Sequence, residues 1–542
     1  MRPISPHTIE LIESLSASAS LLSRWLRRVA PPSAAVLDEI VASGEIEAAL
    51  ALLALAVGAT PHHREPLYAA LDRLVRGAPP SALLWLEQRG RTLSEWRRQA
   101  WAWSRDVTPK RIRSFQSSQA SAAGIASMHN DGFVREAAVE VLAASDDPLA
   151  VPFLLIRAND WVAPVREAAA RGIQTHLSHG AARFVPCLEL VDRLKRAGRG
   201  DLRPLAEGIV RALATPAEAP ALRRGCSSAS RTIRRRCFGI AFTSRMADLA
   251  SLVRAGLEDP DGVVRALTAK GAIQALEWRD LEPFIDEMLT SRTPAVRFSA
   301  LEAIWKHRGT ESRAIQERLA LDPHPHVRGT ALWVLRSIPE FRGAAFYRAA
   351  LGKLAGGPEL VGAIEGLGEV GSADDAALIT PFLQHGRARV RTAAVHALAS
   401  VGSKADREAI VMALSDPSPR VCRAACRVLL RGPPLDPERL IFAALRSRLL
   451  HVRSAAIDLA RAHPHWVAAN LLLRIAATGD AETAHRAGVA LAAWEARYNR
   501  VFTKPSPRQV EEFESLLDTA NLDDGLRSRL RALVPALRMR SS

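Results

Sequence analysis

The sequence predicts an all-α fold, a right-handed α-solenoid of antiparallel helix pairs. Three observations predict it: one residue pattern recurs about every 31 residues, it fits one face of a helix, and a second apolar segment follows it. The pattern is clearest in RVRTAAVHALASVG, starting at Arg389, and in RVCRAACRVLL, starting at Arg420. A fixed period of this length indicates a repeat array.

Each copy of the pattern is aligned on an anchor residue, and twelve anchors are found along the chain. Ten of the eleven spacings between successive anchors are 31 or 32 residues, and the spacing after Val165 is 37. The anchors are Val134, Val165, Leu202, Ile233, Val264, Val296, Val327, Glu359, Val390, Val421, Val452 and Ala484.

The fourth residue after every anchor is small and the eighth is apolar, as in Ala394 and Leu398 after Val390. Residues at these positions lie on one stripe of a helix, so each copy contains a first helix with a buried face. A small residue midway along that helix lets the neighbouring helix approach closely. Extra methylenes there would cost roughly 1–3 kcal/mol through overpacking.

Turn residues precede the first helices, clearest in the Asp-Pro pairs at Asp259, Asp322 and Asp416. Aspartate caps free N–H groups at a helix start, and proline presets the first helical angle. Second apolar segments follow, as at Leu149–Ile156, Leu378–Leu383 and Leu440–Leu445, so one unit is a pair of helices.

The pattern Asp-Pro-x-x-x-Val-Arg-x-x-Ala-x-x-x-Leu resembles the HEAT repeat, and its period is similar to the short, phycobilin-lyase-type HEAT-like form. The resemblance covers roughly Asp131 to Ala496. The tetratricopeptide and ankyrin repeats have similar periods, but their signature residues are absent.

Arginine follows the anchor in nine of the twelve copies. One interpretation is a cationic ladder for an acidic partner. The other, which the HEAT resemblance implies, is a structural role in which each guanidinium bonds the acidic turn or exposed carbonyls of a neighbouring unit. The nine residues are Arg135, Arg166, Arg203, Arg234, Arg265, Arg297, Arg328, Arg391 and Arg453.

Three regions are expected: an N-terminal cap or degenerate repeats at 1–125, the array at 126–500, and a C-terminal cap at 501–542. The pattern predicts N-terminal helices at Thr8–Arg28, Ser33–Val57, His63–Arg76, Ser81–Gln88 and Leu93–Arg105, and tail helices at Pro507–Thr519 and Asp523–Leu537. The last N-terminal helix mixes Trp96, Trp101 and Trp103 with arginines, which favours core packing over a nucleic-acid stacking face.

The composition indicates a globular, cytoplasmic protein. The hydrophobic fraction is 48%, the five cysteines form no Cys-x-x-Cys pair, and the first residues lack the layout of a signal peptide. The most apolar run, Ala48 to Val57, is too short to span a bilayer.

The formal net charge is +16, but 66 of the 73 basic residues are arginine, as GC-rich coding also produces. Residues 191–240 hold twelve basic and four acidic residues and begin near the one irregular spacing, where extra length at 176–201 predicts a projecting loop. This basic segment is a candidate for binding nucleic acid or another polyanion. Its candidate residues are Arg193, Lys195, Arg196, Arg199, Arg223, Arg224, Arg231, Arg235 and Arg236.

No catalytic, metal or cofactor motif is found in the sequence. The histidine pairs lack partner ligands at useful intervals, there is no His-Glu dipeptide of the deoxyhypusine hydroxylase kind, and neither a Walker loop nor a Gly-x-Ser-x-Gly elbow occurs. HEAT-like DNA glycosylases and bilin lyases are enzymatic alternatives. In a DNA glycosylase, the carboxylate and the aromatic ring would come from Asp160 with Trp161, or from Asp280 with Trp278.

The favoured hypothesis is a non-catalytic scaffold that binds another macromolecule, a protein first of all, along the concave surface formed by the second helices. Binding of nucleic acid or another polyanion through the basic segment is the alternative. The sequence leaves the partner and the oligomeric state open.

Overall fold

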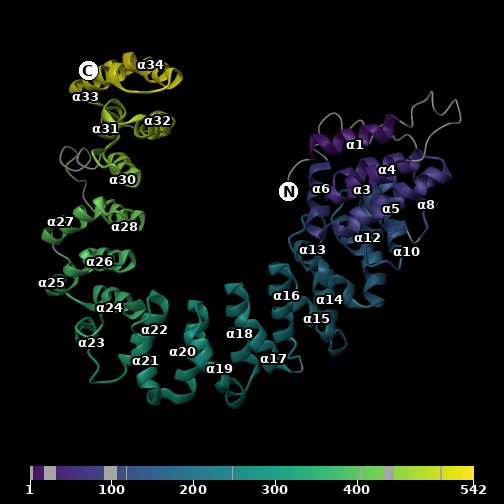
Figure 1. The fold of residues 1–542 in the computed structure, drawn as a ribbon, viewed down its shortest axis with the longest axis horizontal. Helices are drawn as coiled ribbons and strands as arrows, with labels where there is room; N and C mark the ends of the chain where they lie inside the picture. Colours follow the sequence, from purple (N-terminus) through teal and green to yellow (C-terminus); the bar gives the residue numbers. More distant parts are fainter. Residues whose placement is uncertain are drawn as a thin grey trace. The chain divides into compact units, whose positions relative to one another are not determined.

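The computed structural model describes residues 4–17, 32–90, 107–116, 119–246, 248–402, 404–432, 436, 445–500 and 503–541. Within these residues the regular secondary structure is helical and there is no strand, so the predicted all-α class is confirmed. Residues 1–296 and 297–542 form two compact units. Figure 1 labels the helices in chain order.

One predicted helix of the N-terminal region, Ser33–Val57, is divided into two shorter helices. Gly44 has a left-handed backbone (φ +65°) and ends a helix within the expected Ser33–Val57 segment, because glycine adopts this conformation without steric cost. The helices are α1 (Pro6–Ala17), α3 (Ala34–Ser43), α4 (Ala48–Gly58), α5 (Pro61–Gly77), α6 (Pro80–Gly90), α8 (Pro109–Arg113) and α9 (Ala120–Ala126). Residues 18–28 and the predicted Leu93–Arg105 helix with its tryptophans lie outside the described residues.

Each of the twelve anchors lies in its own helix or at its N-cap, as the pattern predicts. These first helices are α10 (Gly132–Ala144), α12 (Ala163–Ser178), α14 (Arg203–Leu213), α16 (Arg231–Thr243), α18 (Gly262–Ala275), α20 (Pro294–Arg308), α22 (Pro325–Leu335), α24 (Gly357–Val370), α26 (Ala388–Val401), α28 (Pro419–Leu429), α30 (Leu450–Arg461) and α32 (Ala481–Glu495).

Second helices follow the first ones in the described parts of the array. They are α11 (Ala150–Arg157), α13 (Leu188–Leu194), α15 (Ala219–Cys226), α17 (Leu249–Glu258), α19 (Trp278–Thr290), α21 (Arg313–Leu319), α23 (Gly343–Leu351), α25 (Ala376–Ile379), α27 (Lys404–Met412) and α31 (His465–Thr478). Most of the predicted Leu440–Leu445 segment, residues 440–444, lies outside the described residues.

The small side chains midway along the first helices face the interior, which confirms the packing prediction. Eleven of the twelve have no exposed surface, and Gly488 is half-buried. Successive first helices pack on one another, as α10 does on α12 and α24 on α26. The approach is close: a Cβ added to Gly172 of α12 would lie 2.8 Å from the Cβ of Ala143 in α10. The anchor at Glu359 is exposed, however, and Leu360 beside it is buried.

The extra length at 176–201 is mostly helical, so the prediction of a projecting loop is wrong for most of it. Residues Ala181–Cys187 form a 3-10 helix that leads into α13, and only residues 179–180 and 195–202 lie outside helices between α12 and α14. At the other end of the chain, α33 (Pro507–Thr519) and α34 (Asp524–Ser541) match the two predicted tail helices.

Candidate functional site

A series of Arg–Asp ion pairs, called the Arg–Asp ladder below, joins successive repeats of the array. In four places the arginine after an anchor donates both Nε–H and Nη2–H to an aspartate 25 residues further on: Arg135 to Asp160, Arg234 to Asp259, Arg297 to Asp322 and Arg391 to Asp416. Each aspartate also accepts the backbone N–H of the residue two positions ahead, which fixes the turn before the next first helix.

The other repeat arginines with described side-chain bonds also contact turns or neighbouring helices. Arg166 donates to the carbonyls of Asp160 and Trp161, and Arg265 to Thr293 Oγ1 and the carbonyl of Asp259. Arg328 pairs with Glu365 and Glu369, and Arg453 bonds Thr483 Oγ1 and pairs with Asp480. These guanidiniums therefore lie among protein acceptors.

At Asp160 the ladder extends into a buried cluster of charges. Arg157, at the end of α11, donates Nη1–H to Asp160 Oδ2 at 2.7 Å and pairs through Nη2 with Glu87 of α6. Arg135, Arg157 and Asp160 are 3%, 2% and 2% exposed. Burial alone would raise the pKa of Asp160, but the hydrogen bonds from Arg135 and the Val162 N–H, with the charges of both arginines, hold that pKa below its usual range.

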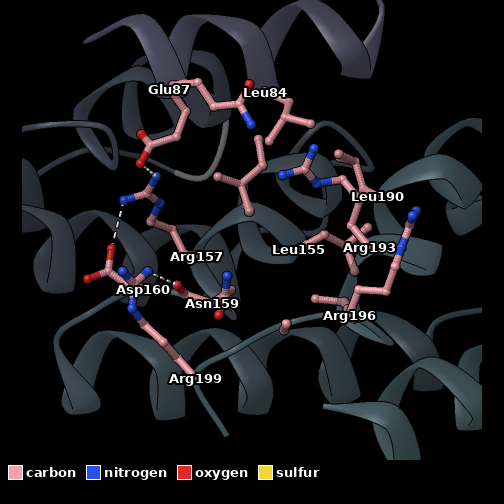
Figure 2. A pocket seen from close by; sticks show the side chains of 14 residues that line it. Leu84, Glu87, Leu155, Arg157, Asn159, Asp160, Leu190, Arg193, Arg196 and Arg199 are labelled. Carbon is pink, nitrogen blue, oxygen red and sulfur yellow. Dashed lines mark hydrogen bonds and ion pairs between the residues drawn. The ribbon is translucent and has the colours of Figure 1, made fainter. Parts of the chain in front are cut away.

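A cavity of about 610 Å³ lies beside this cluster, between α6, α11 and α13 (Figure 2). Its volume is within the range of about 300–1,000 Å³ that is typical of ligand sites. The lining residues are Leu84, Glu87, Gln88, Leu155, Ile156, Arg157, Asn159, Asp160, Leu190, Arg193, Leu194, Arg196, Ala197 and Arg199.

The irregular spacing in the repeat supplies one edge of the cavity. Arg193 is in α13, and Arg196 and Arg199 are in the non-helical residues that follow it. Arg199 donates Nη1–H to the carbonyl of Asn159 at 3.3 Å, so the inserted segment folds back against the end of α11. All three arginines are exposed.

Three of the nine candidate polyanion-binding residues, Arg193, Arg196 and Arg199, line the cavity, and the other six do not. Lys195 and Arg236 both pair with Asp192. Arg223 pairs with Asp248, and Arg235 with Asp261. Arg224 in α15 and Arg231 in α16 are exposed and do not line the cavity.

Among the described residues, no group of three or more His, Cys, Asp or Glu side chains is placed to hold a metal ion. A search of the same residues finds no helix that is long and apolar enough to cross a membrane. Asp280 of the glycosylase alternative is exposed and lies 3.6 Å from the guanidinium of Arg279.

Residues 360–431, from α24 through α28, match the family model for HEAT repeats. The chain has an all-α, HEAT-like solenoid fold, and the family match is confined to these residues. No curated protein matches the chain.

Several solved structures are similar to the chain at low identity. The S. pombe condensin Cnd3-Cnd2 subcomplex is 13% identical with a TM-score of 0.33, over 98% of this chain and 76% of that one. Kap121p bound to Nup53p is 13% identical with a TM-score of 0.32, over 98% of this chain and 58% of that one. A tumor overexpressed gene (TOG) domain array of a microtubule polymerase is 12% identical with a TM-score of 0.23, over 70% of this chain and 100% of that one.

Proposed function

We propose that this HEAT-repeat chain is a non-catalytic scaffold that binds a protein partner through the surface formed by its second helices. Solenoids of this kind offer extended surfaces, and their usual role is protein–protein interaction. The cavity supports this assignment because two of the three helices that form it, α11 and α13, are second helices of successive units.

The observation that carries the proposal is the pairing of the two carboxylates in the cavity with a buried arginine. Asp160 and Glu87 both pair with Arg157, and the depressed pKa of Asp160 keeps it ionised. A general acid or base works best with a pKa near the working pH, and a carboxylate held by two arginines is far from that condition. The cavity is therefore better suited to holding a ligand than to transferring protons.

Three more specific assignments are also part of this proposal. They are the short, phycobilin-lyase-type form of the repeat, the caps at 1–125 and 501–542 around an array at 126–500, and a cytoplasmic location without a cofactor. The period of about 31 residues supports the first, and five buried cysteines that form no disulfide support the location.

Nucleic-acid binding has less support, because four of the nine candidate basic residues pair with aspartates. The glycosylase alternative would need Asp160 as a free carboxylate, but both its oxygens accept hydrogen bonds from arginines.

Site-specific photo-crosslinking in the native cell extract tests the proposal. A photoreactive residue in place of Ala197, at the cavity, should give a covalent adduct with one protein in near-stoichiometric yield. The same residue in place of Glu167, exposed on the first helix α12, should give none. Adducts only from position 167, or no adduct from either position, would refute binding through the second helices.

A further inference from the structure

We propose that the α6–α11–α13 cavity binds an acidic peptide segment that carries aliphatic side chains, which rests on the proposed scaffold function. The cavity edge presents three exposed guanidiniums, and its carboxylates do not neutralise them. Glu87 and Asp160 face Arg157, and Asp160 also faces Arg135, so both carboxylates are already paired with buried arginines. Across the described part of the chain, Arg193 and Arg196 have no ion-pair partner.

The positions of the arginines favour a ligand with several separate negative groups. Figure 2 shows Arg193 and Arg196 on the α13 side of the cavity and Arg199 next to Asn159 and Asp160. A guanidinium binds a carboxylate through two parallel hydrogen bonds. Glutamate or aspartate side chains spaced along a peptide could each meet one of these arginines.

The remaining lining residues favour aliphatic groups between the charges. Leu155, Leu190 and Leu194 are buried, and Leu84 is half-buried beside them. An aliphatic side chain placed against these leucines would leave water, which is favourable by about 25 cal/mol for each Å² of apolar surface.

Two polar atoms at the cavity wall are buried without a hydrogen-bond partner in the described residues: Arg157 Nε and Asn159 Oδ1. An unsatisfied buried donor or acceptor is unfavourable, because it has lost its hydrogen bonds to water without gaining others. A peptide carries both groups that they lack, an acceptor oxygen for Arg157 Nε–H and a backbone N–H donor for Asn159 Oδ1. A phosphodiester chain offers only the acceptor from its backbone.

The lining also disfavours a nucleic-acid strand. None of the described residues that line the cavity is aromatic, whereas proteins that bind single strands without sequence preference stack the bases on aromatic rings. The cavity chemistry therefore favours the acidic peptide.

The test is a fluorescence-anisotropy titration of the full chain with a short labelled peptide of alternating glutamate and leucine. Replacing Arg193, Arg196 and Arg199 together by glutamine should weaken binding about tenfold or more, since each exposed charge pair contributes roughly 0.2–1 kcal/mol and 1.4 kcal/mol is tenfold. The control replaces Arg223, Arg224 and Arg231 by glutamine, which removes the same charge from the same basic segment away from the cavity. It should change the dissociation constant less than twofold.

Two further probes separate the ligand classes: the same peptide with glutamine for glutamate, and a single-stranded oligonucleotide. Weak binding of the neutral peptide, and oligonucleotide binding that the cavity substitutions leave unchanged, would support the proposal. Equal loss of the acidic peptide in both variants, no binding by the unmodified chain, or a cavity-dependent preference for the oligonucleotide would overturn it. Because the peptide is synthetic, these results do not depend on whether the photo-crosslinking experiment finds a native partner.

Discussion

Replacing Asp160 by asparagine is expected to lower the free energy of unfolding of the 1–296 unit by roughly 3–5 kcal/mol. The side chain of Asp160 has no exposed surface, and it accepts hydrogen bonds from the buried guanidiniums of Arg135 and Arg157. An asparagine has nearly the same shape but no charge, so two buried cations would lose their shared counter-ion. Urea unfolding followed by circular dichroism measures the change.

The control for Asp160→Asn is Asp38→Asn in the same unit. Asp38 pairs with Arg73 at 2.6 Å, but both side chains are more than half exposed. Exposed pairs contribute about 0–1 kcal/mol, so this substitution should have a small effect. A similar loss of stability in both variants would show that the buried charge cluster does not stabilise the fold more than an exposed ion pair does.

Replacing Gly362 by alanine is expected to destabilise the 297–542 unit by about 3 kcal/mol, at the upper end of ordinary overpacking costs. Gly362 is buried in α24, and a Cβ there would lie 1.9 Å from the carbonyl oxygen of Leu321 and 2.4 Å from its carbonyl carbon. Because the obstacle is backbone, rotation of a side chain cannot relieve the clash. The melting temperature and the urea midpoint should both fall.

The matched control is Gly329→Ala in α22, where an added Cβ meets nothing within 4 Å. Alanine is favoured over glycine within a helix by about 1 kcal/mol, so this variant should be slightly more stable than the natural chain. If Gly362→Ala were equally well tolerated, close packing of α24 against the Leu321–Asp322 turn would not be a feature of the fold.

The sequence was sufficient to predict the repeat because each helix pair buries the same stripe. Ala394 and Leu398 occupy positions whose packing environment recurs in every repeat. The period and the residue size together therefore predicted the helices and their buried faces. The broken Ser33–Val57 helix was missed because a single glycine, Gly44, turns the chain within a continuous apolar pattern.

The candidate cavity could be predicted only in part. A local excess of arginine pointed to Arg193, Arg196 and Arg199, but the same reasoning included Arg235 and Arg236, whose aspartate partners come from other helices. Glu87 and Arg157 were not predicted at all. They are 70 residues apart and outside the repeated positions, so only the packing of α6 against α11 shows that they pair.

Hydrogen–deuterium exchange of the full chain, with and without the glutamate–leucine peptide, tests most directly whether the cavity is the binding site. We expect the peptide to slow amide exchange in α11 and in residues 188–203, and to leave exchange in α26 and α28 unchanged. Slower exchange confined to α15 and α16, or spread evenly over all the first helices, would contradict binding at the cavity.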